Sequence, residues 1–585
     1  MDKQITFDKK EDLPLVTSSF ESMAWNKTGD WRYLKPIFQD KTPPCNNSCP
    51  AGEDVQGYLY LVQKKRYKEA WSLIKEENPL PAVCGRACMH PCEDFCNRGE
   101  FDEPINISAV ERFLADHAMK RGYILSPIKR KEKKEKIAII GSGPAGLSCA
   151  YQLRRMGYHI TLFEALPVLG GILRIGIPDY RLPKYILEHE IDTILGLGIQ
   201  IQTKARIDRE TITKDMKDFQ AIFIATGSHI STRLGIAGED SGSVMSGLDF
   251  LKDIHLGKKV PLGKKVAVIG GGNTAIDAAR LVLRLGAKPF ILYRRTPGEM
   301  PAIKSEVIQA EKEGIEISYL ISLTRIVPQG DRVITLECVK NRSGPPDASG
   351  KKTLIEIKDS HFQIEADNII SAIGEVPDIS ILPQEIDVKN QLIVTDESLE
   401  TTMNGIFAGG DVKSPLRSIA HAIGSGKRAA ISIDRYLKAK TLEDVMDTIR
   451  IGDGPSLSMR SYLKRDDPSR RKSKEVVRFR DINIDYFEQS SRHAVQTLSI
   501  DQSISSNKEV HLGFPCETAL QEANRCFSCG VCNHCDNCYL FCSDLAVIKQ
   551  KGKIRNTIDY DHCKGCGVCA EECPRDCIYM EREEK

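Results

Sequence analysis

The sequence has no excess of charge of either sign and no long hydrophobic run. Its 82 basic and 80 acidic residues leave a net charge of +2, so the charge balance gives no reason to expect nucleic acid or a membrane surface as a partner. The opening MDKQITFDKKEDLPL has no apolar segment typical of a secretion signal, and no run approaches 18 apolar residues. We therefore expect a soluble cytoplasmic protein that neither binds nucleic acid nor inserts into a membrane.

The cysteine content is high for a chain without a secretion signal. The 585 residues include 20 cysteines, and in this setting they favour thiolate ligands or reduced thiols over disulfides. All but two fall into two groups, Cys45 to Cys96 and Cys516 to Cys577. The other two, Cys149 and Cys338, are isolated, and Cys149, inside a predicted helix, is expected to pack in a hydrophobic core. At about 150 residues per domain, this length predicts three to five domains.

The C-terminal group contains two cysteine runs of the same spacing, C-x2-C-x2-C-x3-C, offset by 31 residues. This is the ligand pattern of a bacterial-type ferredoxin with two [4Fe–4S] clusters, in which the fourth cysteine of each run ligates the other cluster. The predicted ligands of cluster one are Cys532, Cys535, Cys538 and Cys573, and those of cluster two are Cys563, Cys566, Cys569 and Cys542. The pattern predicts a conductor of single electrons.

Four further features surround these runs. Cys526 and Cys529 precede them and are either alternative ligands or part of a structural hairpin, of which we favour the hairpin. Cys577 is interpreted as a core residue. Ser543 follows the first run where ferredoxins usually have proline, which loosens the turn but removes no ligand. Residues 558–581 resemble the ferredoxin-type subunit of 2-oxoacid:ferredoxin oxidoreductases, although the motif is widely shared.

A first dinucleotide-binding signature follows the charged linker KRKEKKEK (129–136). The apolar strand from Ile137 to Ile140 leads into a G-x-G-x-x-G loop and an amphipathic helix. The glycines permit a tight turn, a close approach of backbone to pyrophosphate and close helix packing. Glu164 ends the next strand, where a carboxylate accepts hydrogen bonds from ribose hydroxyls. The expected contacts are Gly141, Ser142, Gly143, Pro144, Ala145, Gly146 and Glu164.

A second dinucleotide-binding signature follows about 130 residues after the first. Its loop is the G-x-G-x-x-A variant, which ends in alanine. Its expected contacts are Gly270, Gly271, Gly272, Asn273, Thr274 and Ala275. The acid expected after the next strand is absent, and Arg294 and Arg295 stand there instead. Guanidinium groups pair with a 2′-phosphate that a carboxylate would repel, so the sequence favours NADP(H) over NAD(H). The alternative is that both arginines only solvate a strand end.

Two nested dinucleotide folds resemble the plan of the two-dinucleotide-binding flavoprotein reductases. The resemblance implies that the first fold binds FAD and that Gly405 to Asp411 returns to complete it, with Gly410 and Asp411 near the ribityl and phosphate groups. Other residues that it implies are Gly171 and Arg181 for FAD, Thr226 and Gly227 at the crossing between the folds, and Gly374 at the return crossing. No Cys-x4-Cys pair follows the FAD signature, which argues against the disulfide-reductase branch.

The N-terminal cysteines lie in PPCNNSCPAGEDVQGYLYLV and in residues 78–113. Together with LGGILRIGIPDYRLPK and the second nucleotide fold, these segments resemble the glutamate synthase small subunit and the N-terminal part of dihydropyrimidine dehydrogenase over about residues 41–440. In those proteins the helical domain binds iron–sulfur clusters beside the flavin. One cluster takes three cysteines and one other ligand, which by position are Cys49, Cys88, Cys92 and Glu111.

The chain departs from these relatives because it has no cysteine between Met1 and Pro44. Cys45, Cys84 and Cys96 are therefore left as alternative ligands, and we expect one N-terminal cluster. Two other interpretations stay open: a zinc site, because thiolates at these spacings are soft ligands, and unligated structural thiols.

We expect a multidomain α/β protein with two nested Rossmann-like domains. The expected segments are an extended arm (1–40), a helical iron–sulfur domain (41–128), an FAD domain (136–240 and 386–440), an NADPH domain (241–385), a linker (441–510) with SRRKSK as its tether, and an α+β ferredoxin-like module (511–585).

The expected function is an oxidoreductase subunit that passes electrons between NADPH and iron–sulfur clusters by way of FAD. The cofactors perform the chemistry, so no general acid or base is assigned. The expected partner is a separate redox protein in a hetero-oligomer, with 2-oxoacid oxidoreductases as one candidate. The alternatives are the glutamate synthase small subunit and a non-enzymatic, zinc-binding redox-sensing scaffold.

Overall fold

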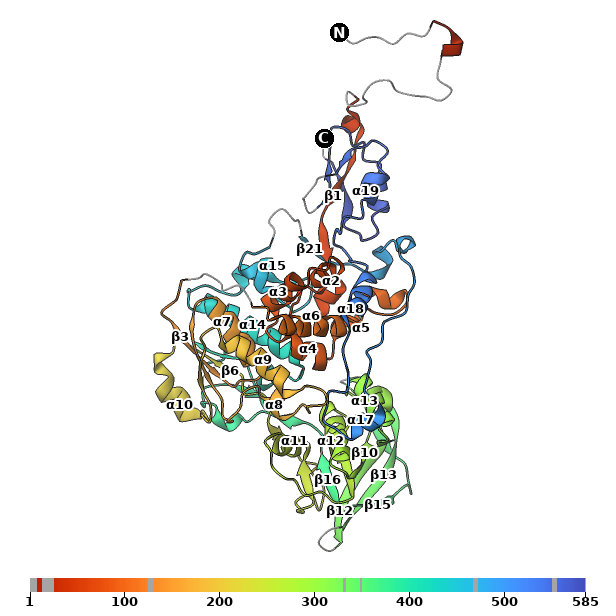
Figure 1. Ribbon diagram of the computed structural model, residues 1–585. Coiled ribbons are helices and arrows are strands. Elements are labelled where there is room, and N and C mark those ends of the chain that lie inside the picture. The colour runs from red at the N-terminus through yellow and green to blue at the C-terminus, as the bar shows by residue number, and fades with distance from the viewer. Residues whose placement is uncertain are drawn as a thin grey trace. The chain divides into compact units, whose positions relative to one another are not determined.

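The computed structural model describes residues 8–12, 26–124, 131–329, 333–347, 350–466, 472–549 and 555–583 (Figure 1). Outside these ranges lie most of the predicted arm before residue 26, residues 129–130 of the charged linker and residues 467–471 at the tether. The chain divides into two compact units. Unit 1 comprises Met1–Pro43, Asp467–Glu488 and Phe527–Lys585, and unit 2 comprises Pro44–Asp466 and Gln489–Cys526. Among the described helices, none is long and apolar enough to cross a membrane.

Unit 2 begins with a cluster of helices that contains all six N-terminal cysteines. The helices are α1 (Pro44–Ser48), α2 (Val55–Gln63), α3 (Tyr67–Glu77), α4 (Pro81–Ala87), α5 (Pro91–Asp94) and α6 (Ile107–Arg121). Asn106 caps α6 by accepting a hydrogen bond from the Ala109 amide, and Gly122 ends the helix in the left-handed region. A Cβ on Gly85 would lie 2.6 Å from the Arg112 backbone nitrogen, so α4 and α6 pack closely only because this residue is glycine.

The first nucleotide fold is a parallel five-stranded sheet in the order β20-β6-β3-β4-β5. Its strands are β3 (Lys136–Ile140), β4 (His159–Phe163), β5 (Gln200–Gln202), β6 (Ala221–Ile224) and β20 (Ile406–Ala408). The helices that belong to this fold include α7 (Pro144–Arg155), α8 (Ile172–Ile175), α9 (Lys184–Leu195), α10 (Arg209–Lys214) and α14 (Ile419–Tyr436). The chain leaves the sheet after β6 and returns at β20, which nests the second fold inside the first.

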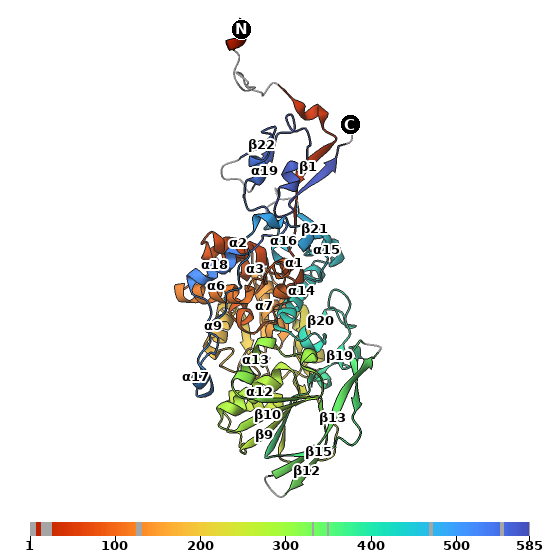
Figure 2. The ribbon, with the colours of Figure 1, turned by 90° about the vertical axis from the view of Figure 1, so that its right-hand side faces the viewer.

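The second fold is a parallel sheet in the order β11-β10-β9-β16-β8. An antiparallel insertion follows, whose strands β12, β13 and β15 are labelled in Figure 2. The parallel strands are β8 (Val244–Ser246), β9 (Lys265–Ile269), β10 (Lys288–Tyr293), β11 (Glu316–Tyr319) and β16 (Asn368–Ser371). The helices are α11 (Gly247–His255), α12 (Asn273–Arg284) and α13 (Lys304–Lys312). The insertion comprises β12 (Ile321–Gln329), β13 (Val333–Pro346), β14 (Lys352–Glu356) and β15 (Phe362–Ala366). Cys149 and Cys338 are both fully buried in unit 2, in line with core packing.

The two crossings between the folds lie side by side. β7 (Ile230–Ser231) pairs with β17 (Glu375–Val376), and the Thr232 amide donates to the Gly374 carbonyl at 2.8 Å. A short β18 (Val388–Lys389) and β19 (Leu392–Ile393) hairpin precedes the return to the first sheet.

Unit 1 contains both C-terminal cysteine runs and repeats its own structure. Its elements are β1 (Leu34–Phe38), β2 (Asp40–Thr42), β21 (Lys472–Val476), α19 (Asn537–Leu540), β22 (Val547–Ile548), β23 (Thr557–Ile558), α20 (Val568–Glu571) and β24 (Ile578–Arg582). The helices α19 and α20, like the cysteine runs, are offset by 31 residues. β1 pairs antiparallel with β24, and β2 pairs parallel with β21. The expected arm ends at residue 40, but its last part forms β1 and the start of β2, because each strand has a partner in unit 1.

The predicted linker is also structured. It contains α15 (Glu443–Ile449), α16 (Met459–Tyr462) and α17 (Ile500–Ile504), and α18 (Cys516–Asn524) follows. Helix α18 belongs to unit 2, where it packs against α2 and α6, so the boundary of the C-terminal module lies at Phe527 and not at residue 511.

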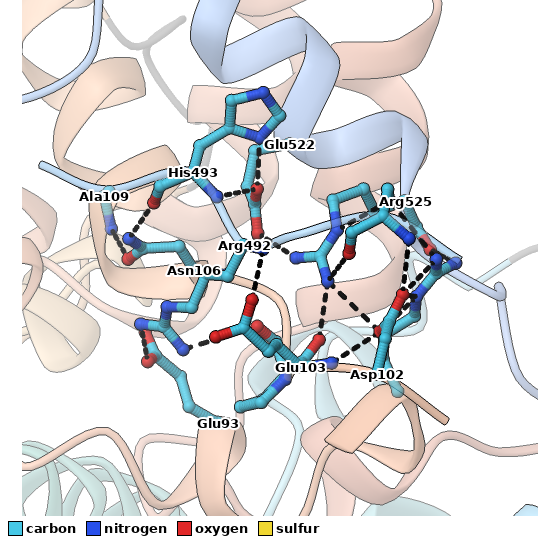
Figure 3. A network of polar contacts seen from close by, with 12 residues as sticks. Glu93, Asp102, Glu103, Asn106, Ala109, Arg492, His493, Glu522 and Arg525 are labelled. Atoms are coloured by element: carbon cyan, nitrogen blue, oxygen red, sulfur yellow. Dashed lines mark hydrogen bonds and ion pairs between the residues drawn. The ribbon is translucent and has the colours of Figure 1, made fainter. Parts of the chain in front are cut away.

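A buried carboxylate explains this boundary (Figure 3). Glu522 on α18 is inaccessible to solvent and accepts hydrogen bonds from the amides of Asn106 at 2.7 Å and His493 at 3.0 Å. Arg525 donates to the same carboxylate at 2.8 Å. These contacts attach both ends of residues 489–526 to the helical part of unit 2.

Candidate functional site

The two glycine-rich loops open onto one cavity of about 1380 Å³ within unit 2. All of the nucleotide-site residues predicted from the sequence line this cavity except Gly146 and Ala275, which lie in helices α7 and α12 behind the loops. The volume exceeds the range of about 300 to 1,000 Å³ that suits one drug-sized ligand. Because both glycine-rich loops open onto it, the cavity is a candidate site for two nucleotides.

Each glycine of the first loop has its own role. Gly141 has a φ of +104°, and a Cβ there would lie 2.4 Å from the Ala225 carbonyl oxygen. A Cβ on Gly146 would lie 1.9 Å from the Gly141 carbonyl oxygen, so helix α7 starts here only with glycine. A Cβ on Gly143 would meet nothing within 4 Å. Gly143 therefore leaves bare backbone facing the cavity, as a pyrophosphate requires.

Polar groups beside the first loop suit a ribose and its phosphate. The Glu164 carboxylate accepts hydrogen bonds from the Ser142 amide at 3.1 Å and the Leu166 amide at 2.9 Å. A carboxylate has further lone pairs, so these bonds leave capacity for ribose hydroxyls. The Thr226 hydroxyl is buried and has no hydrogen-bond partner in the described part of the chain. An unpaired buried hydroxyl lining a cavity fits a polar ligand.

The second loop repeats this arrangement. Gly270 has a φ of +141°, and its Cβ would lie 2.2 Å from the Ala372 carbonyl oxygen. A Cβ on Gly271 would lie 2.4 Å from the Tyr293 ring, whereas one on Gly272 would meet nothing within 4 Å. The Asn273 side chain accepts a hydrogen bond from the Ile303 amide at 3.0 Å, which ties the start of α12 to α13.

The two arginines after β10 have different surroundings. Arg295 donates to Glu299 at 3.0 Å and to the Lys352 carbonyl at 2.7 Å. Arg294 is exposed at the cavity and forms no hydrogen bond or ion pair within the described residues. Lys351 also lines the cavity. Sequence reasoning missed this lysine because it follows β13, far from the glycine loop in sequence.

Arg181 and Asp411 line the cavity in charged surroundings. Arg181 is buried and forms ion pairs with Asp277 at 2.6 Å and Glu306 at 3.5 Å, both from the second fold. Burial raises the pKa of Asp411 to about 6, against the opposing charge of Arg417. The sequence predicts that Arg181 contacts FAD. In the structure its guanidinium forms ion pairs with two carboxylates of the second fold.

A second, smaller pocket lies among the N-terminal helices of unit 2. It is lined by Cys49, Cys84, Cys88, Cys92, Glu53, Glu111, Tyr58, His90 and four other residues. The three predicted cysteine ligands and Glu111 thus line one pocket, together with Cys84, one of the three alternative ligands. Cys45 and Cys96 do not line the pocket. We call this group of residues the thiol pocket.

Buried groups without partners mark the thiol pocket as a ligand site. Tyr58 Oη and His90 Nε2 are buried with no hydrogen-bond partner within the described residues. Burial raises the pKa of Glu53 to about 7 and holds the pKa of Glu111 well above its usual range. The Asn78 amide nitrogen donates to both carboxylates, at 2.7 and 3.3 Å. No motif in the sequence pointed to Glu53, Tyr58 or His90.

Burial also determines the state of the thiols in this pocket. It raises the pKa of Cys88 to about 12 and the pKa values of Cys49, Cys84 and Cys92 well above 9. A thiolate is the form that ligates metal, so these thiols would deprotonate only against bound positive charge. The donor set fits an iron–sulfur cluster.

One peptide segment borders both pockets. Cys88 lines the thiol pocket, while its neighbours Ala87 and Met89 line the large cavity. The start of helix α14 also borders both pockets, because Ile419 lines the large cavity and Ala420 lines the thiol pocket. The two candidate cofactor sites are therefore separated by a single layer of residues.

In unit 1 the fourth cysteine of each C-terminal run lies near cysteines of the other run, and the ligand sets of the two clusters stay predictions. Cys573 of the second run interacts electrostatically with Cys535 and Cys538 of the first. Cys542 of the first run interacts in the same way with Cys563 and Cys569. Among the residues that the structure describes, no group of three or more His, Cys, Asp or Glu is close enough to hold a single metal ion.

Three cysteines outside the predicted sets have distinct places. Cys529 is buried in unit 1, and Cys526 packs against the core of unit 2. Cys577 is buried as expected, but its Sγ lies 3.4 Å from that of Cys573. It therefore touches the predicted ligands and does not pack only against apolar groups.

Three protein families match parts of the chain. Residues 135–426 match the pyridine nucleotide-disulphide oxidoreductase family. Residues 37–123 match domain II of dihydropyrimidine dehydrogenase with its 4Fe-4S cluster, and residues 556–579 match the 4Fe-4S binding domain.

Similar proteins extend these matches over most of the chain. The beta subunit of the NADP(+)-dependent formate dehydrogenase of Moorella thermoacetica is 36% identical over 83% of this chain and 70% of its own. The NADPH-Fe(3+) oxidoreductase subunit beta of Geobacter sulfurreducens is 36% identical over 84% of this chain and 76% of its own. The NADPH glutamate synthase small chain of Escherichia coli is 32% identical over 68% of this chain and 89% of its own.

The chain belongs to the glutamate synthase small chain-like family of FAD and NAD(P) oxidoreductases. The predicted fold class is confirmed, with a helical iron–sulfur domain, nested nucleotide folds and a C-terminal ferredoxin region. The protein is an NAD(P)H-dependent flavin iron–sulfur oxidoreductase of the beta-subunit type. Its relatives are subunits of larger enzymes, which implies a partner subunit.

Proposed function

We propose that this protein is an electron-transfer subunit that exchanges electrons between NADPH and a separate redox enzyme, by way of FAD and three [4Fe–4S] clusters. The observation that carries the proposal is the shared wall between the large cavity and the thiol pocket. Ala87 and Met89 border the cavity, and Cys88 between them borders the thiol pocket. Electrons that leave the cavity through this segment arrive directly at a candidate cluster ligand.

The residues of this chain position the nucleotides. Bare backbone at Gly143 and Gly272 admits a pyrophosphate to each loop, and the starts of α7 and α12 face it. Arg294 pairs with the 2′-phosphate of NADPH, while Arg295 holds the loop to Glu299 and the insertion. Bound FAD supplies the chemistry that connects a two-electron hydride carrier with one-electron acceptors. The protein needs no general acid or base for this exchange.

Each cluster has a proposed ligand set. Cys532, Cys535, Cys538 and Cys573 hold cluster one, and Cys563, Cys566, Cys569 and Cys542 hold cluster two. The N-terminal cluster takes Cys49, Cys88, Cys92 and Glu111. Cys84 is the first alternative, because it lines the same pocket.

The proposed partner is an oxidoreductase subunit that the C-terminal module contacts. Relatives of this chain serve in a formate dehydrogenase and in an Fe(3+) oxidoreductase, and the C-terminal cysteine motif resembles the ferredoxin-type subunit of 2-oxoacid oxidoreductases. Each of these reactions transfers electrons to or from a substrate. A subunit of that chemistry, in a hetero-oligomer with this chain, is the proposed partner.

Anaerobic reduction of the purified protein tests the proposal. NADPH is expected to bleach a flavin spectrum that lies beneath a broad cluster band, to reduce the clusters and to sustain reduction of a viologen dye. Three clusters correspond to about twelve iron atoms per chain. A colourless, zinc-loaded protein would contradict the proposal. Dependence on glutamine and 2-oxoglutarate in a two-subunit complex would favour the glutamate synthase function instead.

A further inference from the structure

Unit 1 contains a fifth thiol beside the four assigned to cluster one. The Sγ of Cys577 lies 3.4 Å from that of Cys573, and the Cys577 thiol also interacts with the Cys532 thiol. Cys577 is only 4% exposed, so water does not compete for these contacts. The two partners come from different cysteine runs, but both belong to the proposed ligand set of cluster one.

The backbone around Cys577 is fixed from both sides. Cys577 immediately precedes β24, which pairs with β1. The Gln39 amide donates to the Cys577 carbonyl at 3.1 Å. The position of the thiol is therefore set by the sheet and not by the cysteine runs alone.

The internal repeat of the module provides a natural comparison for Cys577. The offset of 31 residues that relates the two runs places Ala546 at the equivalent position beside cluster two. The Ala546 amide donates to Cys542 Sγ at 3.2 Å, and the Cys577 amide hydrogen-bonds with Cys573 in the same way. Ala546 is also buried, with 1% exposure. At this position the two halves of the repeat thus share the backbone N–H donor and differ by the S–H group of Cys577.

We propose that the Cys577 thiol donates a hydrogen bond to the sulfur ligands of cluster one and raises its reduction potential, so that electrons in the C-terminal module collect there. This inference rests on the proposed function, because it requires both clusters. Hydrogen bonds to cluster sulfurs are among the factors that set the potential. A donor stabilises the reduced cluster more, because reduction adds negative charge that the sulfurs share.

The electron balance of this step is simple. One electron leaves cluster two, which is oxidised, and enters cluster one, which is reduced. Cys577 keeps its hydrogen, so no proton is transferred and no further reactant is needed. Cys577 acts as a positioning residue, since it works through Cys532 and Cys573.

Three variants of the full chain test this role. Cys577→Ala removes the S–H donor, Cys577→Ser keeps a donor at the same place, and Ala546→Cys adds the missing thiol beside cluster two. Each protein is purified anaerobically, its iron is counted, and the midpoint potentials of its clusters are measured by EPR-monitored redox titration. Iron content and wild-type signals test the proposed function separately, before any variant is compared.

The expected result is a shift of one reduction wave. In Cys577→Ala the iron content stays at the wild-type value. The equilibrium constant for reduction of one cluster falls by up to about tenfold, which lowers its midpoint potential by up to about 59 mV for one electron. Cys577→Ser is expected to recover most of the shift, and Ala546→Cys to raise the potential of the other cluster.

Three results would overturn the inference. Loss of one cluster's iron in Cys577→Ala would mean that Cys577 is itself a ligand. Unchanged potentials in Cys577→Ala, with full iron content, would mean that the thiol only fills space. An absence of C-terminal cluster signals in the wild-type protein would refute the proposed function, and the inference with it.

Discussion

At the residue scale, two adjacent arginines that look equivalent in the sequence have different tasks. Arg295 is held by Glu299 and by the Lys352 carbonyl, so its guanidinium is already hydrogen-bonded. Arg294 is exposed at the cavity. A free guanidinium can bind a 2′-phosphate without first losing a protein partner. Discrimination between NADPH and NADH should therefore depend mainly on Arg294.

Replacing Arg294 by Ala should weaken the use of NADPH by about 1 to 3 kcal/mol, the value of a hydrogen bond to a charged group. Reduction of the flavin by NADH should change far less, because NADH has no 2′-phosphate. Stopped-flow rates of flavin reduction at several concentrations of each cofactor measure both effects. Arg325→Ala, which removes an exposed arginine outside the cavity, is the matched control. Equal losses with both cofactors would refute the assignment.

At the element scale, the N-terminal strand β1 is part of the C-terminal module. Arg32, just before β1, is buried and binds both carboxylate oxygens of Glu583 at 2.7 and 2.9 Å. Its third nitrogen donates to the carbonyls of Tyr560 at 2.6 Å and Cys563 at 2.8 Å. Residues from the two ends of the chain therefore complete one fold around the cysteine runs.

Replacing Arg32 by Ala should destabilise unit 1 by about 2 to 4 kcal/mol, because it leaves two carbonyls and a carboxylate without their donor. Loss of cluster absorbance in increasing guanidinium chloride, followed anaerobically, measures this effect. The control is Lys27→Ala, which removes the exposed ion pair with Asp561 and should cost far less, because water screens an exposed ion pair. Similar losses in both variants would mean that β1 is not attached through Arg32.

At the scale of the whole molecule, residues 489–510 connect three parts of unit 2. Glu509 forms ion pairs with Arg86 and Arg112 of the helical part. The Val510 amide donates to the Tyr180 carbonyl of the first nucleotide fold at 2.9 Å. Ser503 donates to Glu313 of the second fold at 2.6 Å. The segment predicted as a linker thus holds together the parts that must align for electron transfer.

Glu313 makes this connection dependent on pH. Burial would raise the pKa of Glu313, but hydrogen bonds from Arg280 and Arg284 outweigh it and lower the pKa to about 2. Because the folded-state pKa lies below the ordinary value of 4.5, the stabilisation is complete above about pH 4.5. It is lost as the pH falls toward 2.

Replacing Glu313 by Gln should lower the stability at neutral pH by about 3 to 5 kcal/mol, because Arg280 and Arg284, both buried, lose a carboxylate partner. The difference from wild type should shrink as the pH falls below 4.5. Thermal unfolding followed by circular dichroism between pH 6 and 3 measures both. Glu316→Gln, which changes an exposed carboxylate on β11, serves as the control. A difference that stays constant with pH would contradict the role of the Glu313 charge.

Much of the candidate site could be predicted because its motifs are local. The glycine loops gather on one cavity, since each motif is a strand, turn and helix that folds within about thirty residues. The cysteine spacings likewise predict candidate ligand sets, because consecutive ligands within each C-terminal run lie three or four positions apart. Glu53, Lys351 and Met89 were missed because they join the site from elements with no such pattern.

The family, the nested nucleotide folds and the chemistry of each cysteine group follow from the amino-acid sequence alone, because short runs of residues encode these features. The division of the chain into units depends instead on tertiary contacts, because β1 with β24, and Glu522 with Asn106, join residues hundreds of positions apart. The same reason applies to the wall formed by Ala87, Cys88 and Met89 and to the place of Cys577. Which side chains meet across such distances depends on the packing of whole elements, which no local pattern contains.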